Sequence, residues 1–407
     1  MDRRTFSRLV PLGAASLAVQ PVSRVAADPP RISPRPGVPE ATLEPVGNET
    51  SAAAVPVSTA EYERLAHDAL PRATYEYIST GSADEFTLRE NTAAFQRIKL
   101  LPPLLRGVSV PDTSTTVLSQ KISFPVLLAP VAGQRLYHPD GGLAAARAAA
   151  LAGTIYGMSS SVGHSVEEIG AAGSGPKWFQ LYVPKDRGVA RALIERVNQS
   201  GFQAIVLTVD LGEWKDADRR NRFALPREML LRHLQDIGFP EVSDRMTDTE
   251  LTQFNLNCWD LALNWEFFDW LRTVTKLPLL IKGVLRADDA RRAVAMGLDG
   301  IVVSNHGGRR LDGMPSSIEM LPEVADAVGG KVDILLDSGV RRGTDVLKAI
   351  ALGARAVLIG RPYVWALSAG GEPAVSHVIQ LLRDEFTNAM IACGCQTVAE
   401  IQPSLLR

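Results

Sequence analysis

The chain has few cysteines, no block of like charges and no long apolar run in its body. Its three cysteines, Cys258, Cys393 and Cys395, are too few for a disulfide framework in 407 residues and lack the paired spacing of a zinc site. With 43 basic and 45 acidic residues the formal net charge is -2, and no basic cluster predicts a nucleic-acid partner. Beyond the N-terminus, no segment offers the roughly eighteen consecutive apolar residues of a membrane-spanning helix. We therefore expect a globular protein without a metal site, a nucleic-acid partner or a later transmembrane segment.

The composition predicts a substantial hydrophobic core. Hydrophobic residues make up 46% of the chain and charged residues 22%, which is ordinary for a globular protein. Length alone suggests two or three domains, but α/β barrels often use about 250 residues or more as one unit. One large domain is therefore compatible with this length.

The N-terminus resembles a twin-arginine export signal. Arg3 and Arg4 precede a mildly apolar stretch at 9–22, and small residues follow at 25–27, where a signal peptidase would cleave. We expect residues 1–27 to be a signal peptide and the mature protein, starting at Asp28, to be periplasmic or otherwise outside the cytoplasm. The alternative is an ordinary basic terminus on a cytoplasmic protein. Repeated prolines between 28 and 57 predict an extended linker, so the folded domain is expected at 58–407.

Short apolar runs alternate with longer helical patterns from Phe124 onward, which is typical of parallel strands joined by helices. The predicted strands are 126–129, 154–158, 178–181, 204–209, 279–281, 300–303, 333–336 and 356–359. Helical spacing is clearest at 142–151, 189–199, 287–296 and 344–352. Eight such units predict a (β/α)8 barrel, preceded by an N-terminal helical segment. An open doubly wound sheet shows the same alternation, but no G-x-G-x-x-G motif opens the first unit.

The connection after the fourth strand, residues 211–278, is too long for a simple crossover. It predicts a lid or extra helices over the carboxyl end of the barrel, where the loops after the strands form the active-site face. At that end, residues 337–345 (DSGVRRGTD) and 360–362 (GRP) place glycines and arginines before helices. Backbone amides, a helix N-terminus and arginine side chains bind phosphate well, so these segments predict a phosphate site. The alternative is that the glycines only make tight turns and the arginines are solvated.

Three titratable residues follow apolar strands and suggest chemistry. His306 follows a buried run and can take a proton near neutral pH, and Arg309, three residues later, can hold an anion beside it. Lys282 ends an apolar strand, where a buried ammonium requires a negative partner. Asp210 can stabilise a protonated His306, although a helix cap or turn is the simpler interpretation of that residue. The pattern predicts a general base beside an anion-binding group.

Six segments together carry a resemblance to a known family: 304–313 (SNHGGRRLDG), 337–345, 360–362, 179–182 (FQLY), 207–210 (LTVD) and 281–284 (IKGV). From about Ser58 to Leu406 the chain resembles the FMN-dependent L-2-hydroxy acid oxidases and dehydrogenases, which include glycolate oxidase, lactate oxidase and mandelate dehydrogenase. The resemblance implies FMN-dependent oxidation of an L-2-hydroxy acid to the 2-oxo acid.

The same resemblance implies residue roles. His306 would be the catalytic base, paired with Asp210, and Lys282 would stabilise reduced FMN. Tyr182 would contact the substrate hydroxyl, while Tyr77 and Arg309 would bind the substrate carboxylate. The implied FMN contacts are Pro130, Ala132, Ser159, Gln180, Thr208, Lys282, Ser304, Asp337, Gly339, Arg341, Gly360 and Arg361. A homotetramer is implied as well, with oxygen, a quinone or a cytochrome as the electron acceptor.

Two departures from the family pattern concern substrate binding. Lys215, in 211–216 (LGEWKD), takes the place of an arginine that helps bind the carboxylate, and lysine lacks the bidentate fork. Ser161 stands where several relatives place an aromatic residue, which suggests a roomier or more polar pocket. The alternatives to a hydroxy acid oxidase are therefore an FMN-barrel enzyme of another substrate class, such as an isomerase, and a non-catalytic flavin-binding protein.

Overall fold

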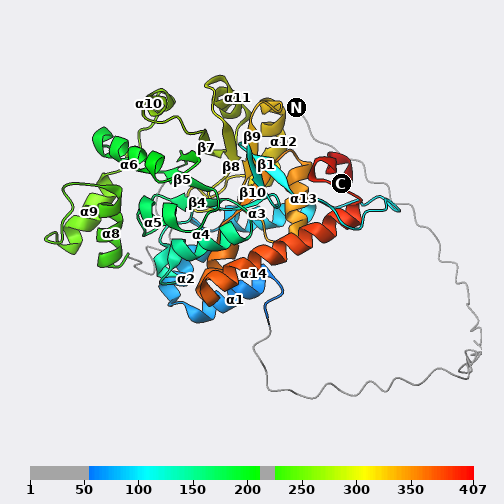
Figure 1. The fold of residues 1–407 in the computed structure, drawn as a ribbon, viewed down its shortest axis with the longest axis horizontal. Helices are drawn as coiled ribbons and strands as arrows, with labels where there is room; N and C mark the ends of the chain where they lie inside the picture. The colour runs from blue at the N-terminus through cyan, green and yellow to red at the C-terminus, as the bar shows by residue number, and fades with distance from the viewer. Residues whose placement is uncertain (1–54, 211–224) are drawn as a thin grey trace, which may run out of the picture. The chain divides into compact units, whose positions relative to one another are not determined.

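Eight parallel strands close into a barrel in the computed structural model, which describes residues 55–210 and 225–407 (Figure 1). The order around the barrel is β10-β3-β4-β5-β6-β7-β8-β9, so sequential strands are neighbours throughout. The strands are β3 (Val126–Leu128), β4 (Tyr156–Ser159), β5 (Lys177–Leu181), β6 (Ala204–Thr208), β7 (Leu279–Val284), β8 (Gly300–Val303), β9 (Asp333–Leu336) and β10 (Ala356–Ile359). The prediction of a (β/α)8 barrel is confirmed.

The strand β7 differs most from its predicted range, because it continues past Ile281 to Val284. The register with β8 shifts between Lys282 and Val284, and Gly283 there has a φ of +112°. A Cβ atom on Gly283 would lie 2.7 Å from the Cβ of Asp210. Glycine at this bulge therefore allows the Asp210 side chain to lie against β7.

A short hairpin that the sequence pattern did not predict covers the amino-terminal end of the barrel. It consists of β1 (Thr115–Val117) and β2 (Gln120–Ile122), paired antiparallel. Val117 and Ile122 belong to the same buried cluster as inward-facing barrel residues such as Trp178, whose Nε1 donates to Gln120 Oε1 at 3.1 Å. Because apolar side chains fill this end of the barrel, we expect the active site at the carboxyl end.

Helices surround the barrel and precede it. The N-terminal helices are α1 (Thr59–Ala69), α2 (Arg72–Ser79) and α3 (Phe86–Arg97), and Ser58 caps α1 by accepting from Glu61 N. The barrel helices are α4 (Gly141–Leu151), α5 (Val166–Ala171), α6 (Arg187–Gln199), α11 (Ala287–Ala295), α12 (Ser317–Val328), α13 (Gly343–Ala351) and α14 (Arg361–Cys393). Three short 3-10 helices complete the described elements: η1 (Gln134–Leu136), η2 (Val398–Glu400) and η3 (Pro403–Leu405). No helix of the described residues is long and apolar enough to cross a membrane.

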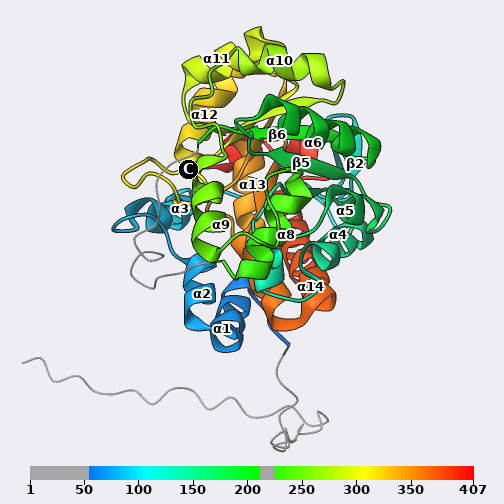
Figure 2. The ribbon, with the colours of Figure 1, turned by 90° about the vertical axis from the view of Figure 1, so that its left-hand side faces the viewer.

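The long connection between β6 and β7 contains α8 (Arg227–Ile237), α9 (Asp248–Asn257) and α10 (Phe267–Val274), as Figure 2 shows. This confirms the predicted extra helices after the fourth barrel strand. The predicted export signal, most of the predicted linker and Lys215 lie outside the described residues.

Candidate active site at the carboxyl end of the barrel

The predicted cofactor and catalytic residues lie on neighbouring strands at one end of the barrel. Ser159 of β4 pairs with Gln180 of β5, and Thr208 of β6 pairs with Lys282 of β7. The other predicted residues follow strand ends: Pro130 and Ala132 after β3, Asp210 after β6, Ser304 and His306 after β8, Asp337 and Gly339 after β9, and Gly360 and Arg361 after β10. Parallel pairing brings these carboxyl ends to one rim, as the sequence analysis expected.

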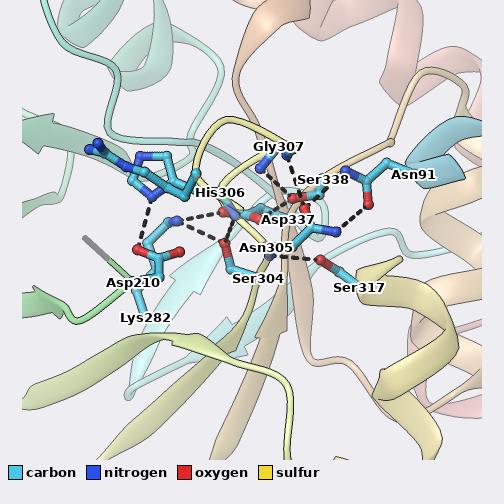
Figure 3. A network of polar contacts seen from close by, with 12 residues as sticks. Asn91, Asp210, Lys282, Ser304, Asn305, His306, Gly307, Ser317, Asp337 and Ser338 are labelled. Atoms are coloured by element: carbon cyan, nitrogen blue, oxygen red, sulfur yellow. Dashed lines mark hydrogen bonds and ion pairs between the residues drawn. The ribbon is translucent and has the colours of Figure 1, made fainter. Parts of the chain in front are cut away.

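His306 and Asp210 form a hydrogen-bonded pair at this rim (Figure 3). His306 Nδ1 lies 2.9 Å from Asp210 Oδ1, and 18% of the His306 side chain remains exposed. Burial favours the neutral acid of Asp210, but His306 and Lys282 beside it hold the pKa of this carboxyl well below its usual range. An ionised carboxylate only accepts, so the proton lies on Nδ1 and Nε2 is left as the acceptor.

The pKa of His306 is lowered to about 4, chiefly because burial disfavours the imidazolium. Asp210 opposes this shift, whereas the positive charges of Arg310 and Lys282 add to it. The imidazole is therefore neutral at neutral pH and can take a proton at Nε2.

Lys282 is buried, and its ammonium group contacts two side chains. Its Nζ donates to Ser304 Oγ at 2.8 Å and forms an ion pair with Asp337 Oδ2 at 3.1 Å. Burial alone would lower the pKa of Lys282, but the negative charges of Asp337 and Asp210 outweigh burial and raise this pKa above its ordinary value. The ammonium group therefore stays charged. Ser304 Oγ also accepts from the backbone N of His306 at 3.0 Å, which joins the lysine and the histidine loop.

A pair of asparagines holds the loop that carries His306. Asn91 of α3 and Asn305 exchange side-chain hydrogen bonds of 2.9 and 2.7 Å across 214 residues of sequence. The Asn305 side chain also accepts from the backbone N of Gly308, and Gly307 N donates to Ser338 Oγ (Figure 3). Asn91 could not be predicted from the sequence, because no local pattern distinguishes it from other polar helix residues.

Tyr182 and two adjacent arginines lie beside the pair of His306 and Asp210. The hydroxyl of Tyr182 is 3.5 Å from His306 Nε2, and Arg310 donates to that hydroxyl from NH2 at 3.1 Å. Arg309 NH1 donates instead to the backbone carbonyls of Tyr77 and Ile78, and its guanidinium lies 5.2 Å from the Tyr77 ring centroid. The structure thus brings Tyr77, Tyr182 and Arg309 into one region, and it adds Arg310, which the sequence analysis missed.

Ser161 contacts a buried histidine of the extra helices. Its Oγ lies 3.2 Å from Nε2 of His233 in α8, and the His233 ring stacks on Trp259 with centroids 5.9 Å apart. Trp259 in turn contacts the Tyr182 ring edge-on at 6.2 Å. Burial lowers the pKa of His233 to about 4, so this ring is neutral at neutral pH. Ser161, His233 and Trp259 therefore form a packed wall beside Tyr182, and the sequence analysis had singled out Ser161 alone.

Two buried polar atoms at the rim fit the polar edge of a flavin ring. Gln180 Nε2 and Thr208 Oγ1 have no hydrogen-bond partner among the described residues. The carbonyl of the same Gln180 amide accepts from Ser159 Oγ at 3.2 Å, so its orientation is fixed. Buried donors and acceptors are rarely left unsatisfied, and the pyrimidine edge of FMN offers both kinds of group.

Arginines gather near the predicted phosphate site. Burial lowers the pKa of Arg361 well below its ordinary value, and the nearby charges of Arg309 and Arg341 lower it further. In the described part of the chain, none of these three guanidiniums forms an ion pair with a carboxylate. A Cβ on Gly339, whose φ is +92°, would lie 2.0 Å from the carbonyl oxygen of Asn91, so only glycine fits there. Clustered cations beside a glycine turn fit a phosphate dianion.

Comparisons with known proteins agree with this geometry. The chain matches the family model described as FMN-dependent dehydrogenase over residues 66–407. It is 47% identical over 344 residues to glycolate oxidase 3 of Arabidopsis thaliana, covering 84% of this chain and 93% of the relative. It is 46% identical over 358 residues to an L-lactate oxidase of Nostoc sp., covering 86% and 98%. A mandelate oxidase crystal structure, 40% identical, superposes with a TM-score of 0.77 and covers 87% and 98% of the two chains. The resemblance drawn from the motifs is confirmed, and the chain belongs to the FMN-dependent dehydrogenase family.

Proposed function

We propose that this chain is an FMN-dependent oxidoreductase that converts an L-2-hydroxy acid to the 2-oxo acid. The observation that carries the proposal is the pair of His306 and Asp210, which leaves His306 Nε2 as an acceptor 3.5 Å from the Tyr182 hydroxyl. Relatives named glycolate oxidase and L-lactate oxidase match 84% and 86% of this chain. FMN, when bound, supplies the acceptor for the two electrons that leave the substrate carbon.

The chain's own residues supply proton handling and charge. Asp210 fixes the tautomer of His306, so Nε2 takes the proton that the substrate loses, and the carboxylate then stabilises the imidazolium. Lys282 places a positive charge at the rim, where a reduced flavin would carry negative charge. Tyr182 is assigned to the substrate hydroxyl, and Tyr77 and Arg309 to its carboxylate. Lys215 is proposed to assist them weakly, because an ammonium gives no bidentate contact.

The decisive experiment is an anaerobic screen of 2-hydroxy acids against the purified protein. Loss of the flavin absorbance on mixing would demonstrate the proposed oxidation, and an isomerase or a flavin-binding protein would leave the spectrum unchanged. Release of the chromophore by denaturation should yield FMN, because Arg341, Arg361 and Gly339 are proposed to bind a single phosphate group. Recovery of FAD, or of no flavin after reconstitution, would contradict that assignment.

We further propose that the mature protein works outside the cytoplasm as a homotetramer and passes electrons to oxygen, a quinone or a cytochrome. The paired Arg3 and Arg4 before a weak apolar segment support export by a route that accepts folded proteins. Replacing both by lysine should retain the protein inside the cell, and unchanged export would refute the signal. Light scattering measures the assembly, and reoxidation of the reduced protein with each acceptor identifies the electron acceptor.

A further inference from the structure

Arg310 contacts the one hydroxyl group that faces the acceptor nitrogen of His306 among the described residues. Its NH2 lies 3.1 Å from the Tyr182 oxygen, and that oxygen lies 3.5 Å from His306 Nε2. Arg310 is half-buried in the loop that follows β8, whereas Tyr182 follows β5. The contact therefore joins two loops across the rim of the barrel.

The chemistry of the three groups determines which one donates. A guanidinium has donors and no acceptor, so in its contact with Arg310 the Tyr182 oxygen accepts. The Nδ1 proton of His306 is held by Asp210, so Nε2 also accepts. The hydroxyl proton of Tyr182 is then the only hydrogen available between Tyr182 and Nε2.

We infer that Arg310 is a positioning residue for the reaction: it fixes Tyr182 so that the hydroxyl proton points at His306 Nε2, or at a substrate oxygen that occupies the same place. This inference rests on the proposed function and adds a residue to it. Without Arg310 the hydroxyl can rotate and present either its oxygen or its proton to the reacting atoms.

The charge of Arg310 strengthens the arrangement. Burial lowers the pKa of Arg310, but Tyr182 and Asp210 raise it above its ordinary value, so the guanidinium keeps its charge. A hydroxyl whose oxygen accepts from a cation is a better donor through its own proton. Arg291 in α11 carries the same charge but is exposed, pairs with Asp288 and has no contact with Tyr182, which makes it the matched control.

Neutron diffraction of the deuterated protein with bound FMN tests the inference directly and needs no turnover. We expect the Tyr182 deuteron on the side of His306 Nε2. A deuteron directed to the Arg310 side, or spread over both positions, would overturn the inference whether or not hydroxy acids are oxidised.

A double-mutant cycle tests the same inference in the reaction. Arg310→Gln and Tyr182→Phe should each slow anaerobic flavin reduction on the order of tenfold. The rate of the double variant should lie within about threefold of the rate of Tyr182→Phe alone. Arg310→Lys should recover part of the rate, because it keeps a charged donor. FMN content and Tm identify misfolded variants, and Arg310→Met completes the cycle if the glutamine variant loses FMN.

The inference would be overturned if the two effects multiplied in the double variant. It would also be overturned if Tyr182→Phe showed the same coupling to Arg291→Gln. Failure of the proposed function has a different signature, because the parent protein would then show no flavin reduction with any 2-hydroxy acid.

Discussion

Replacing Asp210 by asparagine removes the negative charge beside His306 and keeps a side chain of nearly the same size. In the parent protein the carboxylate accepts from His306 Nδ1 at 2.9 Å and raises the histidine pKa against burial, Arg310 and Lys282. The amide oxygen of asparagine can accept the same hydrogen bond but brings no charge. The imidazolium that forms when Nε2 takes the substrate proton then lacks its counter-charge.

The size of the effect follows from this one contact. A hydrogen bond to a charged group contributes about 1.5 to 3 kcal/mol, and about 1.36 kcal/mol corresponds to a tenfold change in rate. We therefore expect Asp210→Asn to slow flavin reduction roughly 10- to 150-fold while FMN stays bound. The pKa of His306 should fall further below its present value of about 4.

Anaerobic stopped-flow measurement of flavin absorbance at saturating hydroxy acid gives the rate directly. Asp186→Asn is the matched control, because Asp186 is an exposed helix cap that accepts from Gly188 and Val189 and has no contact with His306. The control should reduce its flavin at the parent rate. A rate within about threefold of the parent for Asp210→Asn, with FMN retained, would show that no imidazolium forms in the step that limits reduction.

Three further predictions concern His306, His233 and Lys215. His306→Ala should retain FMN and lose roughly 10²- to 10⁴-fold in flavin reduction, the usual contribution of a general base; a rate within about tenfold of the parent would show that another base acts. The pKa of His233 is about 4 in the folded protein against about 6.5 when unfolded, so the unfolded state binds more protons between these values and stability falls as pH falls through this window. His233→Gln should therefore reduce the decrease in Tm between about pH 7 and pH 4, and an unchanged decrease in a thermal scan would contradict this. Lys215→Arg should raise kcat/KM for glycolate and lactate by roughly one to two orders of magnitude, with the parent preferring bulkier acids; no change for any acid would show that this segment does not reach the substrate.

The barrel could be predicted because its eight strands are short apolar runs that alternate with helical patterns. The hairpin of β1 and β2 could not, because each strand has only three residues and mixed polarity. Val117 and Ile122, the two buried residues of the hairpin, are buried by contact with the side chains of the barrel interior, which the local sequence does not reveal. The predicted end of β7 at Ile281 is too early for a related reason, because the bulge at Gly283 depends on pairing with the neighbouring strand β8.

The central site residues could be predicted because a parallel barrel brings every strand end to one rim. Asp210 and Lys282 directly follow or end an apolar run and His306 lies three residues after one, and the structure places them in contact or in one network. Arg310 and His233 could not be predicted in the same way. Adjacent arginines in a loop point in different directions, and His233 comes from a helix whose position over the rim depends on long-range packing.

Two non-glycine residues at this rim have a left-handed backbone. His306 has a φ of +58° and Ser338 a φ of +75°, conformations that cost non-glycine residues of the order of 1 to 3 kcal/mol. Specific contacts offset that cost: Ser304 Oγ accepts from His306 N, and Ser338 Oγ accepts from Gly307 N and donates to Asp337. Asp337 in turn pairs with the buried Lys282, so one network satisfies the strained loop and the buried charge together. From this turn after β8, the imidazole contacts Asp210, which follows β6, two strands away. The backbone strain and the proton-accepting geometry at Nε2 are therefore parts of the same arrangement, and loosening the loop would weaken the base even with every catalytic side chain present.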